Sequence, residues 1–333
     1  MANAEPRPTL ADVAARAGVS KSLVSLVMRD EPGAGAETRR RVLDAADALG
    51  YHPDSRARLL RSGRSRLLGV VFGIQHAFHV DLVTSLYTAA RDSGYELALS
   101  AVTPDRDEAE ATASLLQDRC EALIMCGPRT PAASLARLAT RLPVIVLARS
   151  VRGADVIRTA DAEGLRQAVD HLAELGHRRI AHIDGGRAPG AADRRAGYRE
   201  AMNARGLGGH IQVVTGGLTE DEGANAAHEL FEHDERPTAV TVFNDRCATG
   251  VLDVLLRSGL RVPEDVSVVG YDDSHLARLA HINLTTIAQD TDTMTRLAVA
   301  RAIDRIDGTE AGRRTLVVPP RLVIRRTTAP AAT

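Results

Sequence analysis

Polar and basic side chains near the start of the chain are spaced so that they can form hydrogen bonds with a nucleic acid. Two short stretches with apolar residues at helical spacing lie between Thr9 and Val27, on either side of Gly18. Thr9 and Ser20 are well placed to cap the two predicted helices, and we also expect both to contact the nucleic acid. We expect the second helix to turn inward Leu23, Val24 and Val27, and to present outward Lys21, Ser22, Ser25, Leu26 and Arg29. This pattern predicts a helix-turn-helix whose second helix enters the major groove of double-stranded DNA.

A third helix and a basic segment follow the helix-turn-helix. The helix is predicted over Glu37–Leu49, with the inward set Val42, Leu43, Ala46 and Leu49. Arginines occupy positions 39–41 in its first turn, where the helix dipole disfavours cations, so contact with DNA phosphates explains them better than a solvated face. Residues 54–66 contain five arginines. They form either a flexible linker or a helix that folds only on DNA, with a leucine wedged into the minor groove.

From Leu67 onward, short apolar runs alternate with amphipathic helical patterns. The expected strands are Leu67–Phe72, Glu96–Val102, Ala122–Cys126, Val144–Leu147, Arg179–Ile183, Gln212–Val214, Ala239–Phe243 and Val266–Val269. The expected helices include Asp81–Ser93, Asp107–Arg119, Gly164–Leu175 and Asp245–Gly259. This alternation predicts an α/β region of two doubly wound parallel-sheet subdomains, with a crossover near Arg158–Asp161.

The charge is distributed unevenly along the 333 residues. Residues 1–66 hold 12 basic and 8 acidic residues, whereas the remainder holds 30 and 35. A basic head on an acidic body is typical of a DNA-binding module joined to a domain that does not need DNA. Neither a signal peptide nor a membrane-spanning run is apparent, and the three cysteines lack metal-ligand spacing. We therefore expect a cytoplasmic protein of two or three domains without a membrane partner.

Three other classes of protein are alternatives on these observations. An enzyme is disfavoured because no Gly-x-Gly-x-x-Gly follows the first strand, and no phosphate loop or Ser/His/Asp order stands out. A free solute-binding protein conflicts with the basic head and the missing signal peptide. An architectural DNA-binding protein would leave the long α/β region unexplained. We expect no catalytic residue, no cofactor and no metal site.

A series of motifs occurs in order along the chain. They are Thr9–Ala14, Ala17–Ser20, Thr38–Val42, Leu49–Pro53, Leu175–Ala181, Arg194–Tyr198, Phe243–Asp245, Val268–Asp273 and Leu284–Gln289. Their order and spacing resemble the lactose-repressor (LacI/GalR) family of bacterial transcription regulators over nearly the whole length. The resemblance implies a helix-turn-helix headpiece at 1–53, a hinge helix or linker at 54–66, and an effector-binding and dimerisation domain at 67–328. Its N-subdomain would comprise about 67–158 and 289–317, and its C-subdomain about 159–288 and 318–328, shaped like periplasmic sugar-binding proteins.

The resemblance also implies a homodimer that binds a near-palindromic operator. By position, Lys21 and Ser22 would read base edges, while Leu60 would intercalate at the operator centre beside Ala57, and Arg56 would contact phosphates. Many members have threonine, arginine and asparagine where this chain has Leu23, Leu26 and Arg29. Because Leu26 can make only apolar contacts, for instance with a thymine methyl, the usual operator sequence is not expected.

In the effector domain, Arg194, Asn244 and Asp272 match family positions that hydrogen-bond the ligand. Their simpler roles would be a solvated charge, a helix cap and a turn residue. In the loop after the first strand, Phe78 could stack on a ligand, and His79 is expected to contact it; two histidines without a third ligand do not make a metal site.

Two departures bear on the chemistry of the effector. Leu218 replaces a common stacking ring, and Ala148 followed by Arg149 replaces a common carboxylate, so an anionic or less hydroxylated effector is one hypothesis. We expect both Leu218 and Arg149 to contact the effector. We expect a repressor whose operator affinity responds to a small effector, a sugar or sugar derivative, bound between the subdomains.

Overall fold

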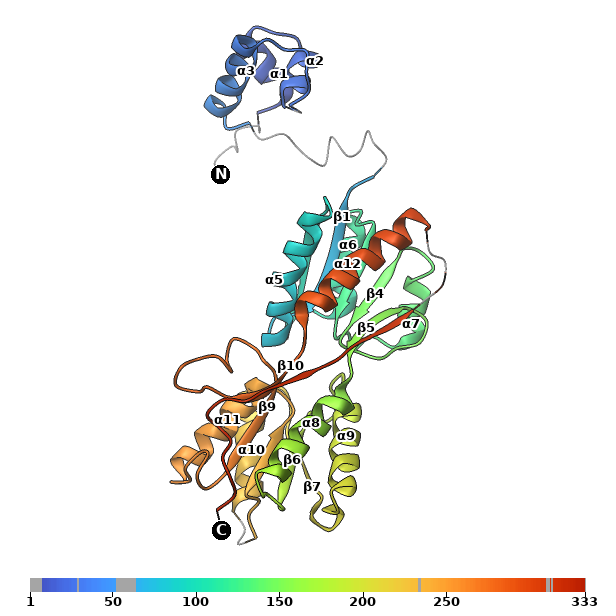
Figure 1. The fold of residues 1–333 in the computed structure, drawn as a ribbon. Helices are drawn as coiled ribbons and strands as arrows, with labels where there is room; N and C mark the ends of the chain where they lie inside the picture. The colour runs from blue at the N-terminus through green and yellow to red at the C-terminus, as the bar shows by residue number, and fades with distance from the viewer. Residues whose placement is uncertain are drawn as a thin grey trace. The chain divides into compact units, whose positions relative to one another are not determined.

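The chain forms two compact units, 1–65 and 66–333, which we describe one at a time (Figure 1). The computed structural model describes residues 8–28, 30–51, 64–232, 235–309, 312 and 314–332. No helix within these ranges is long and apolar enough to cross a membrane.

The first unit contains the predicted helix-turn-helix and a third helix. These are α1 (Leu10–Ala17), α2 (Lys21–Met28) and α3 (Ala36–Ala48). The backbone N–H and the hydroxyl of Thr9 both donate to the Asp12 carboxylate at the start of α1, 2.7 Å away in each case. Gly18 ends α1 at φ 64°, a conformation that glycine adopts without strain. A small core of buried residues holds the three helices together: Val13, Ala14, Ala17, Val24, Val27, Val42, Ala45 and Ala46.

Some predictions for this unit were wrong in detail. Leu43 is 48% exposed and Ala45 takes its place in the core, so the buried face of α3 is rotated relative to the expected one. Leu23 is not part of the core either. Arg39 donates to the Asp30 carboxylate and to the Glu31 carbonyl. Arg39 thus has partners within the headpiece, and the expected contact of residues 39–41 with DNA phosphates stays a prediction.

The second unit contains two six-stranded sheets, so the predicted pair of doubly wound subdomains is confirmed (Figure 1). The first sheet has the order β11-β5-β4-β3-β1-β2, and all its neighbours are parallel. Its strands are β1 (Leu67–Gly73), β2 (Glu96–Val102), β3 (Ala122–Cys126), β4 (Val144–Leu147), β5 (Asp155–Thr159) and β11 (Thr315–Val318). The second sheet has the order β12-β10-β9-β8-β6-β7, in which only β12 is antiparallel to its neighbour. Its strands are β6 (Ile180–Asp184), β7 (Gln212–Thr215), β8 (Ala239–Val242), β9 (Ser267–Asp272), β10 (Thr285–Ala288) and β12 (Arg321–Val323).

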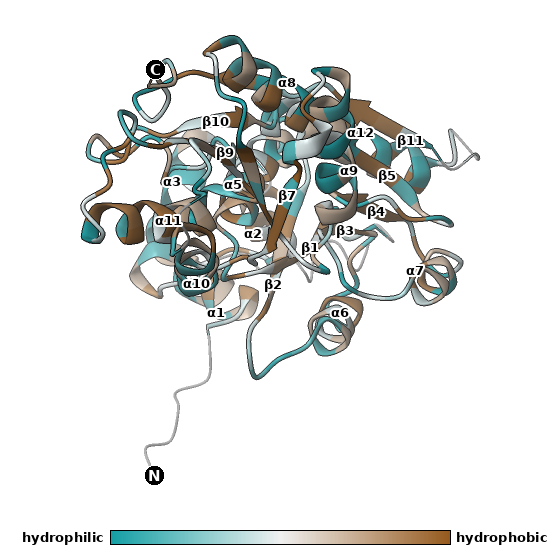
Figure 2. Ribbon diagram, turned by 90° about the horizontal axis from the view of Figure 1, so that it is seen from below, coloured by the Kyte–Doolittle hydropathy of each residue, from teal (hydrophilic) through white to brown (hydrophobic). Residues whose placement is uncertain are grey.

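Helices cover both faces of each sheet and bury its central strands almost completely, whereas edge strands such as β7 and β12 stay partly exposed. The helices are α5 (Ala77–Asp92), α6 (Glu108–Gln117), α7 (Ala132–Leu138), α8 (Asp161–Glu174), α9 (Ala191–Ala204), α10 (Glu220–Phe231), α11 (Asp245–Arg257) and α12 (Thr291–Asp307). One core of the first sheet contains side chains of α5 and α12, and the other contains side chains of α6 and α7. The second sheet is covered likewise by α10 and α11 on one face and by α8 and α9 on the other. Most strands are accordingly brown in Figure 2, whereas the helices carry both colours.

The chain crosses between the two sheets at three places: β5 to α8, β10 to α12, and β11 to β12. The first crossing lies where the sequence predicted one. A hydrogen bond joins two of these crossings: the Thr159 hydroxyl donates to the Gln289 side chain over 2.6 Å. Each subdomain is thus built from separate stretches of the sequence, and the strands of both end beside the crossings. This arrangement positions the candidate site.

Candidate ligand cavity and nucleic-acid interface

The residues expected to contact DNA have different roles in the first unit. Lys21 and Ser22 are exposed at the start of α2. The Ser20 hydroxyl accepts a hydrogen bond from the N–H of Leu23 at 3.2 Å, so it caps α2. Ser25 and Leu26 are half-buried, and Leu26 packs against Gly33 in the loop that follows. Thr9 is exposed at the start of α1.

The polar face of α2 is therefore available to a partner, with Lys21 as its cation among the described residues. Arg29, Arg56, Ala57 and Leu60 lie outside the described residues, and their roles stay predictions.

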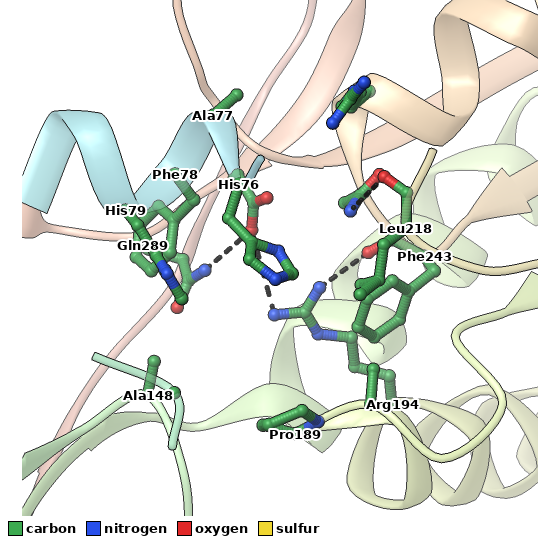
Figure 3. A pocket seen from close by; sticks show the side chains of 15 residues that line it. His76, Ala77, Phe78, His79, Ala148, Pro189, Arg194, Leu218, Phe243 and Gln289 are labelled. Atoms are coloured by element: carbon green, nitrogen blue, oxygen red, sulfur yellow. Dashed lines mark hydrogen bonds and ion pairs between the residues drawn. The ribbon is translucent and has the colours of Figure 1, made fainter. Parts of the chain in front are cut away.

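A cavity lies between the two subdomains, where strands of both sheets end (Figure 3). Ligands of open α/β sheets bind beyond the carboxyl ends of the strands, so this is the expected location for a site. Six of the seven predicted effector residues line it: Phe78, His79, Arg194, Leu218, Asn244 and Asp272. The other lining residues are His76, Ala77, Gly127, Ala148, Ala188, Pro189, Phe243, Arg246 and Gln289. The role of the six predicted residues in effector binding remains a prediction.

Arg194, from α9, is the central cation of the cavity. It is only 6% exposed. Its Nε donates to Asp161 over 2.8 Å, and its Nη1 donates to the carbonyl of Phe243 over 2.6 Å. The guanidinium carbon lies 3.5 Å from the ring centroid of Tyr271, and Nη2 lies 3.8 Å from the carboxylate of Asp272. The proposed simple role of a solvated charge is therefore wrong; Arg194 is a fixed, buried hydrogen-bond donor.

Asp272 is held at the end of β9 in an unusual backbone conformation. Its φ of 111° is one that residues other than glycine rarely adopt, and such strain often accompanies functional sites. Its carboxylate accepts a hydrogen bond from Gln289 over 2.7 Å. Burial raises its pKa well above the usual value, although Arg194 opposes the rise. Asp272 can thus accept or donate a hydrogen bond within the cavity.

Asn244 caps α11, as its simpler role would require. Its Oδ1 accepts from the N–H of Cys247 at 2.7 Å, and its Nδ2 donates to the Leu218 carbonyl at 3.3 Å. The cap fixes the orientation of an amide that also faces the cavity. Asn244 can therefore be both structural and available to a ligand.

Phe78 and His79 lie in the first turn of α5, and His76 lies just before it, so these residues are not in a loop as predicted. Nδ1 of His79 accepts from the N–H of Gly73 at 3.0 Å, and burial lowers the pKa of His79 to about 3, so its ring is neutral near pH 7. Its ring centroid lies 4.5 Å from that of His76. Phe78 is 7% exposed and belongs mainly to the core of the first sheet. No group of three or more metal-ligating side chains occurs in the described part of the chain.

Arg149 does not line the cavity, in contrast to the prediction. Its Nη1 donates to the carbonyls of Pro128 and Thr130, which turns it to the other side of Ala148. Sequence reasoning did not single out Gln289 or Arg246, although Gln289 directly follows a strand in a motif of the family. The free volume of the cavity is about 60 Å³, less than half of the roughly 150 Å³ of an engineered cavity that holds benzene. A ligand as large as a sugar therefore requires the lining side chains or the subdomains to move.

Comparisons with known proteins agree with this architecture. Residues 9–54 match the family described as bacterial regulatory proteins, lacI family, and residues 169–328 match the periplasmic binding protein-like domain. The HTH-type transcriptional regulator GalR of Escherichia coli (strain K12) is 32% identical over 95% of this chain and 94% of its own.

Solved structures with similar folds include three regulators. A LacI transcriptional regulator from a Rhodococcus species is 53% identical, with a TM-score of 0.78 over 80% of this chain and 100% of that one. The lac repressor dimer bound to operator and the anti-inducer ONPF is 30% identical, with a TM-score of 0.82 over 97% and 100%. A complex of the transcriptional regulator CelR with cellobiose is 29% identical, with a TM-score of 0.70 over 96% and 100%. The chain belongs to the LacI family, as its motifs predicted, and is a DNA-binding transcription regulator with a periplasmic-binding-protein-like ligand domain.

Proposed function

We propose that the protein is a homodimeric repressor whose affinity for a near-palindromic operator is set by a small polar effector, a sugar or sugar derivative, in the cavity between the subdomains. We assign residues 1–53 to the DNA-binding headpiece, 54–66 to the hinge and 67–328 to the effector-binding and dimerisation domain. Because it belongs to a family of bacterial DNA-binding regulators, we propose that it acts in the cytoplasm. The relatives are regulators, and we propose no catalytic step.

The observation that carries the effector is the polar set around Arg194. A fixed guanidinium, the carboxyl group of Asp272 and the amides of Gln289 and Asn244 face one buried space. Hydroxyl groups both donate and accept hydrogen bonds, so a polyhydroxylated molecule can satisfy all of these groups together. The Phe243 ring offers an apolar wall to a sugar face. The complex of CelR with cellobiose supports a sugar.

Contacts across the cavity explain how a ligand changes the arrangement of the subdomains. Arg246, at the start of α11, donates to the carbonyl of Gln75, which follows β1. Asp81 of α5 faces Arg278 and His275 of the other subdomain. A ligand that enters the small cavity must alter such contacts. Because β1 continues directly from the hinge segment, a shift of the first sheet reaches the hinge through the backbone. Typical coupling free energies are about 1–3 kcal/mol, or about 5- to 150-fold in operator affinity.

Exposed apolar side chains support the homodimer. Tyr87 on α5 is 49% exposed and Leu256 on α11 is 76% exposed. These two helices lie in different subdomains, so a partner that covers both would sense their relative position. We expect Leu256→Glu to shift the protein from dimer to monomer in sedimentation velocity, whereas Leu43→Glu in the headpiece, also exposed, leaves the dimer unchanged.

The test measures operator binding and its response to ligand with the full chain. The operator is first selected from random double-stranded DNA, and its affinity is then measured by fluorescence anisotropy with a panel of neutral and charged sugars. We expect one panel member to change the operator affinity of the wild type and of the surface control Asp253→Ala, but not of Asp272→Ala, which still binds DNA. The proposal is refuted if no panel member has an effect, or if Asp272→Ala responds as the wild type does.

A further inference from the structure

Three arginines surround a second hollow next to the ligand cavity. This arginine hollow has a volume of about 460 Å³, and its walls are Pro128, Arg129, Arg149, Ser150, Arg187, Ala188, Pro189, Gly190, Ala192 and Asp193. The established DNA-binding role does not use it, and it is much larger than the cavity of about 60 Å³ beside it. The arginines come from the ends of β3 and β4 and from the loop before α9.

Arg149 is held in position, while much of its guanidinium is left for a ligand. Its Nη1 donates to the carbonyls of Pro128 and Thr130, and its Nε and Nη2 have no hydrogen-bond partner among the described residues. The loop that supplies these carbonyls is itself fixed, because Glu108 accepts from the N–H groups of Arg129 and Thr130. A pre-positioned guanidinium with free donors is the usual means of binding phosphate or carboxylate.

The hollow has an excess of positive charge. Within the described part of the chain, the guanidinium groups of Arg129 and Arg187 make no hydrogen bond or ion pair with protein groups. The one carboxylate in the wall is Asp193, which lies 3.8 Å from Arg158 outside the hollow. The positive end of the α9 dipole adds to the field, since α9 begins at Ala191. Clefts lined by one sign of charge concentrate ligands of the opposite sign.

The hollow and the ligand cavity share walls. Ala188 and Pro189 line both, and Ala148 lines the cavity while the next residue, Arg149, lines the hollow. Figure 3 shows Ala148 and Pro189 along the same edge of the cavity, with Arg194 close to Pro189. An elongated molecule can therefore place its hydroxylated part near Arg194 and Asp272 and reach past Pro189 to the arginines.

We propose that the effector is anionic, a phosphorylated or carboxylated sugar, and that its charged group binds in the arginine hollow. This inference rests on the proposed function, because it names the chemical class of the same effector. Arg149 and Arg187 bind the anion directly, and Arg129 supplies further positive charge at the rim.

The first test uses inorganic phosphate as the probe and thermal unfolding of the full chain as the readout. Phosphate is compared with chloride at equal ionic strength. We expect phosphate to raise the Tm of the wild type and of the control Arg199→Ala, which changes an exposed arginine further along α9, more than that of the double variant Arg149→Ala/Arg187→Ala, which keeps only the general stabilising effect of phosphate. The proposal is overturned if phosphate and chloride give the wild type the same Tm, or if the double variant responds like the control.

The second test compares operator release by matched pairs, each a neutral hexose with its 6-phosphate or its uronic acid. We expect the active compound to be an anion that acts at roughly tenfold lower concentration than its neutral partner, and we expect Arg187→Ala to remove that advantage. A neutral hexose that acts equally well in the wild type and in Arg187→Ala, but not in Asp272→Ala, would overturn the anionic effector and leave the proposed function intact. Phosphate binding at the arginines without any effect of any compound on operator affinity would instead refute the proposed function.

Discussion

Replacing Arg194 by methionine tests how much the buried ion pair contributes to stability. The substitution keeps most of the side-chain volume but removes the charge opposite Asp161, which is 5% exposed. It also leaves the Phe243 carbonyl without its donor. Removing one partner of a buried ion pair typically costs about 3–5 kcal/mol, because the other charge stays buried and unpaired. For a domain of this size, we expect the Tm to fall by about 10 °C.

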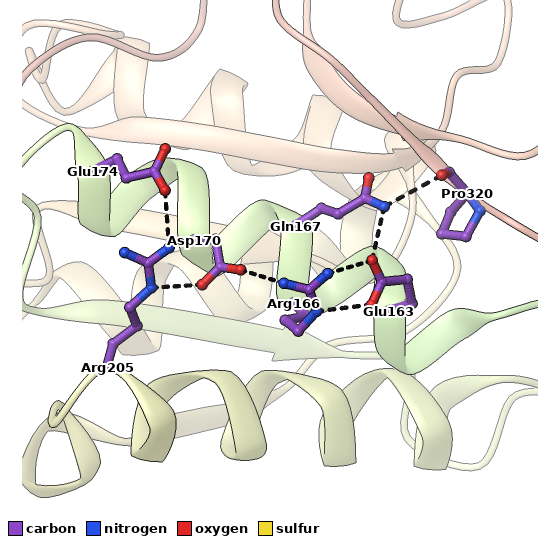
Figure 4. A network of polar contacts seen from close by, with 7 residues as sticks. All are labelled: Glu163, Arg166, Gln167, Asp170, Glu174, Arg205 and Pro320. Atoms are coloured by element: carbon purple, nitrogen blue, oxygen red, sulfur yellow. Dashed lines mark hydrogen bonds and ion pairs between the residues drawn. The ribbon is translucent and has the colours of Figure 1, made fainter.

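The matched control is the same change at an exposed arginine. Arg166 on α8 bridges Glu163 and Asp170 in a surface network that continues through Arg205 (Figure 4). Its side chain is 53% exposed, so its ion pairs are screened by water and contribute about 0–1 kcal/mol. Arg166→Met should therefore change the Tm by no more than a few degrees, although it breaks as many ion pairs as Arg194→Met does.

A second substitution distinguishes the free-energy cost of the unpaired carboxylate from the cost of the lost packing. Asp161→Asn in the Arg194→Met background removes the unpaired carboxylate, and we expect it to restore about 2 kcal/mol, measured as the difference in urea-unfolding free energy between the double variant and Arg194→Met. If Arg194→Met costs no more than Arg166→Met, or if Asp161→Asn restores nothing, the reasoning from burial is wrong. The double variant, once folded, should bind operator without responding to the effector.

Three other predictions concern packing, pH and the headpiece. A Cβ on Gly250 would collide with the Glu220 carbonyl of α10. Gly250→Ala should therefore force α10 and α11 apart and lower the free energy of urea unfolding by about 1–3 kcal/mol or more. The control Gly209→Ala should be neutral, because a Cβ there meets nothing within 4 Å. Burial raises the pKa of Asp245 to about 7, so the folded state favours the protonated form. The stability of the wild type relative to Asp245→Asn should therefore fall by up to about 4 kcal/mol as the pH rises from 4 to 7. A constant difference in Tm between the two proteins across this range would contradict the prediction. Ser20→Ala should remove the α2 cap, destabilise the headpiece by about 1 kcal/mol and weaken operator binding, while Ser20→Asn, which retains an acceptor, should preserve the helix by circular dichroism.

The sequence was sufficient to predict the strands that are continuously apolar, and several boundaries agree to the residue. Val144–Leu147 and Ala122–Cys126 are examples. Two of the strands that were missed, β5 and β10, contain polar groups satisfied by distant partners. In β5, Asp155 is buried because it pairs with Arg301 of α12. In β10, Thr286 is buried because its hydroxyl donates to Asp245. Such pairings between residues far apart in the sequence cannot be inferred from the local pattern.

The candidate site was predictable where a residue type matched a family position, and less so where only geometry decides. Arg194 and Asp272 face the same cavity, as the resemblance implied. Arg149 was placed there too, but two carbonyls of a neighbouring loop turn it into a separate hollow. Gln289 was not singled out, because its importance depends on the crossings that bring it beside Thr159. Contacts made by the tertiary fold, and not the local pattern, decide these positions.

The three crossings between the sheets also determine the order in which the protein can be completed during synthesis. The first sheet receives its strand β11 and its covering helix α12 only from residues 291–318. Until these emerge from the ribosome, apolar side chains of α5 such as Leu82 and Leu86 lack part of their final core, which includes Met294 and Ala298. The subdomain that begins first therefore finishes among the last, and the nascent chain exposes apolar surface through most of its translation, which makes this stage a target for chaperones.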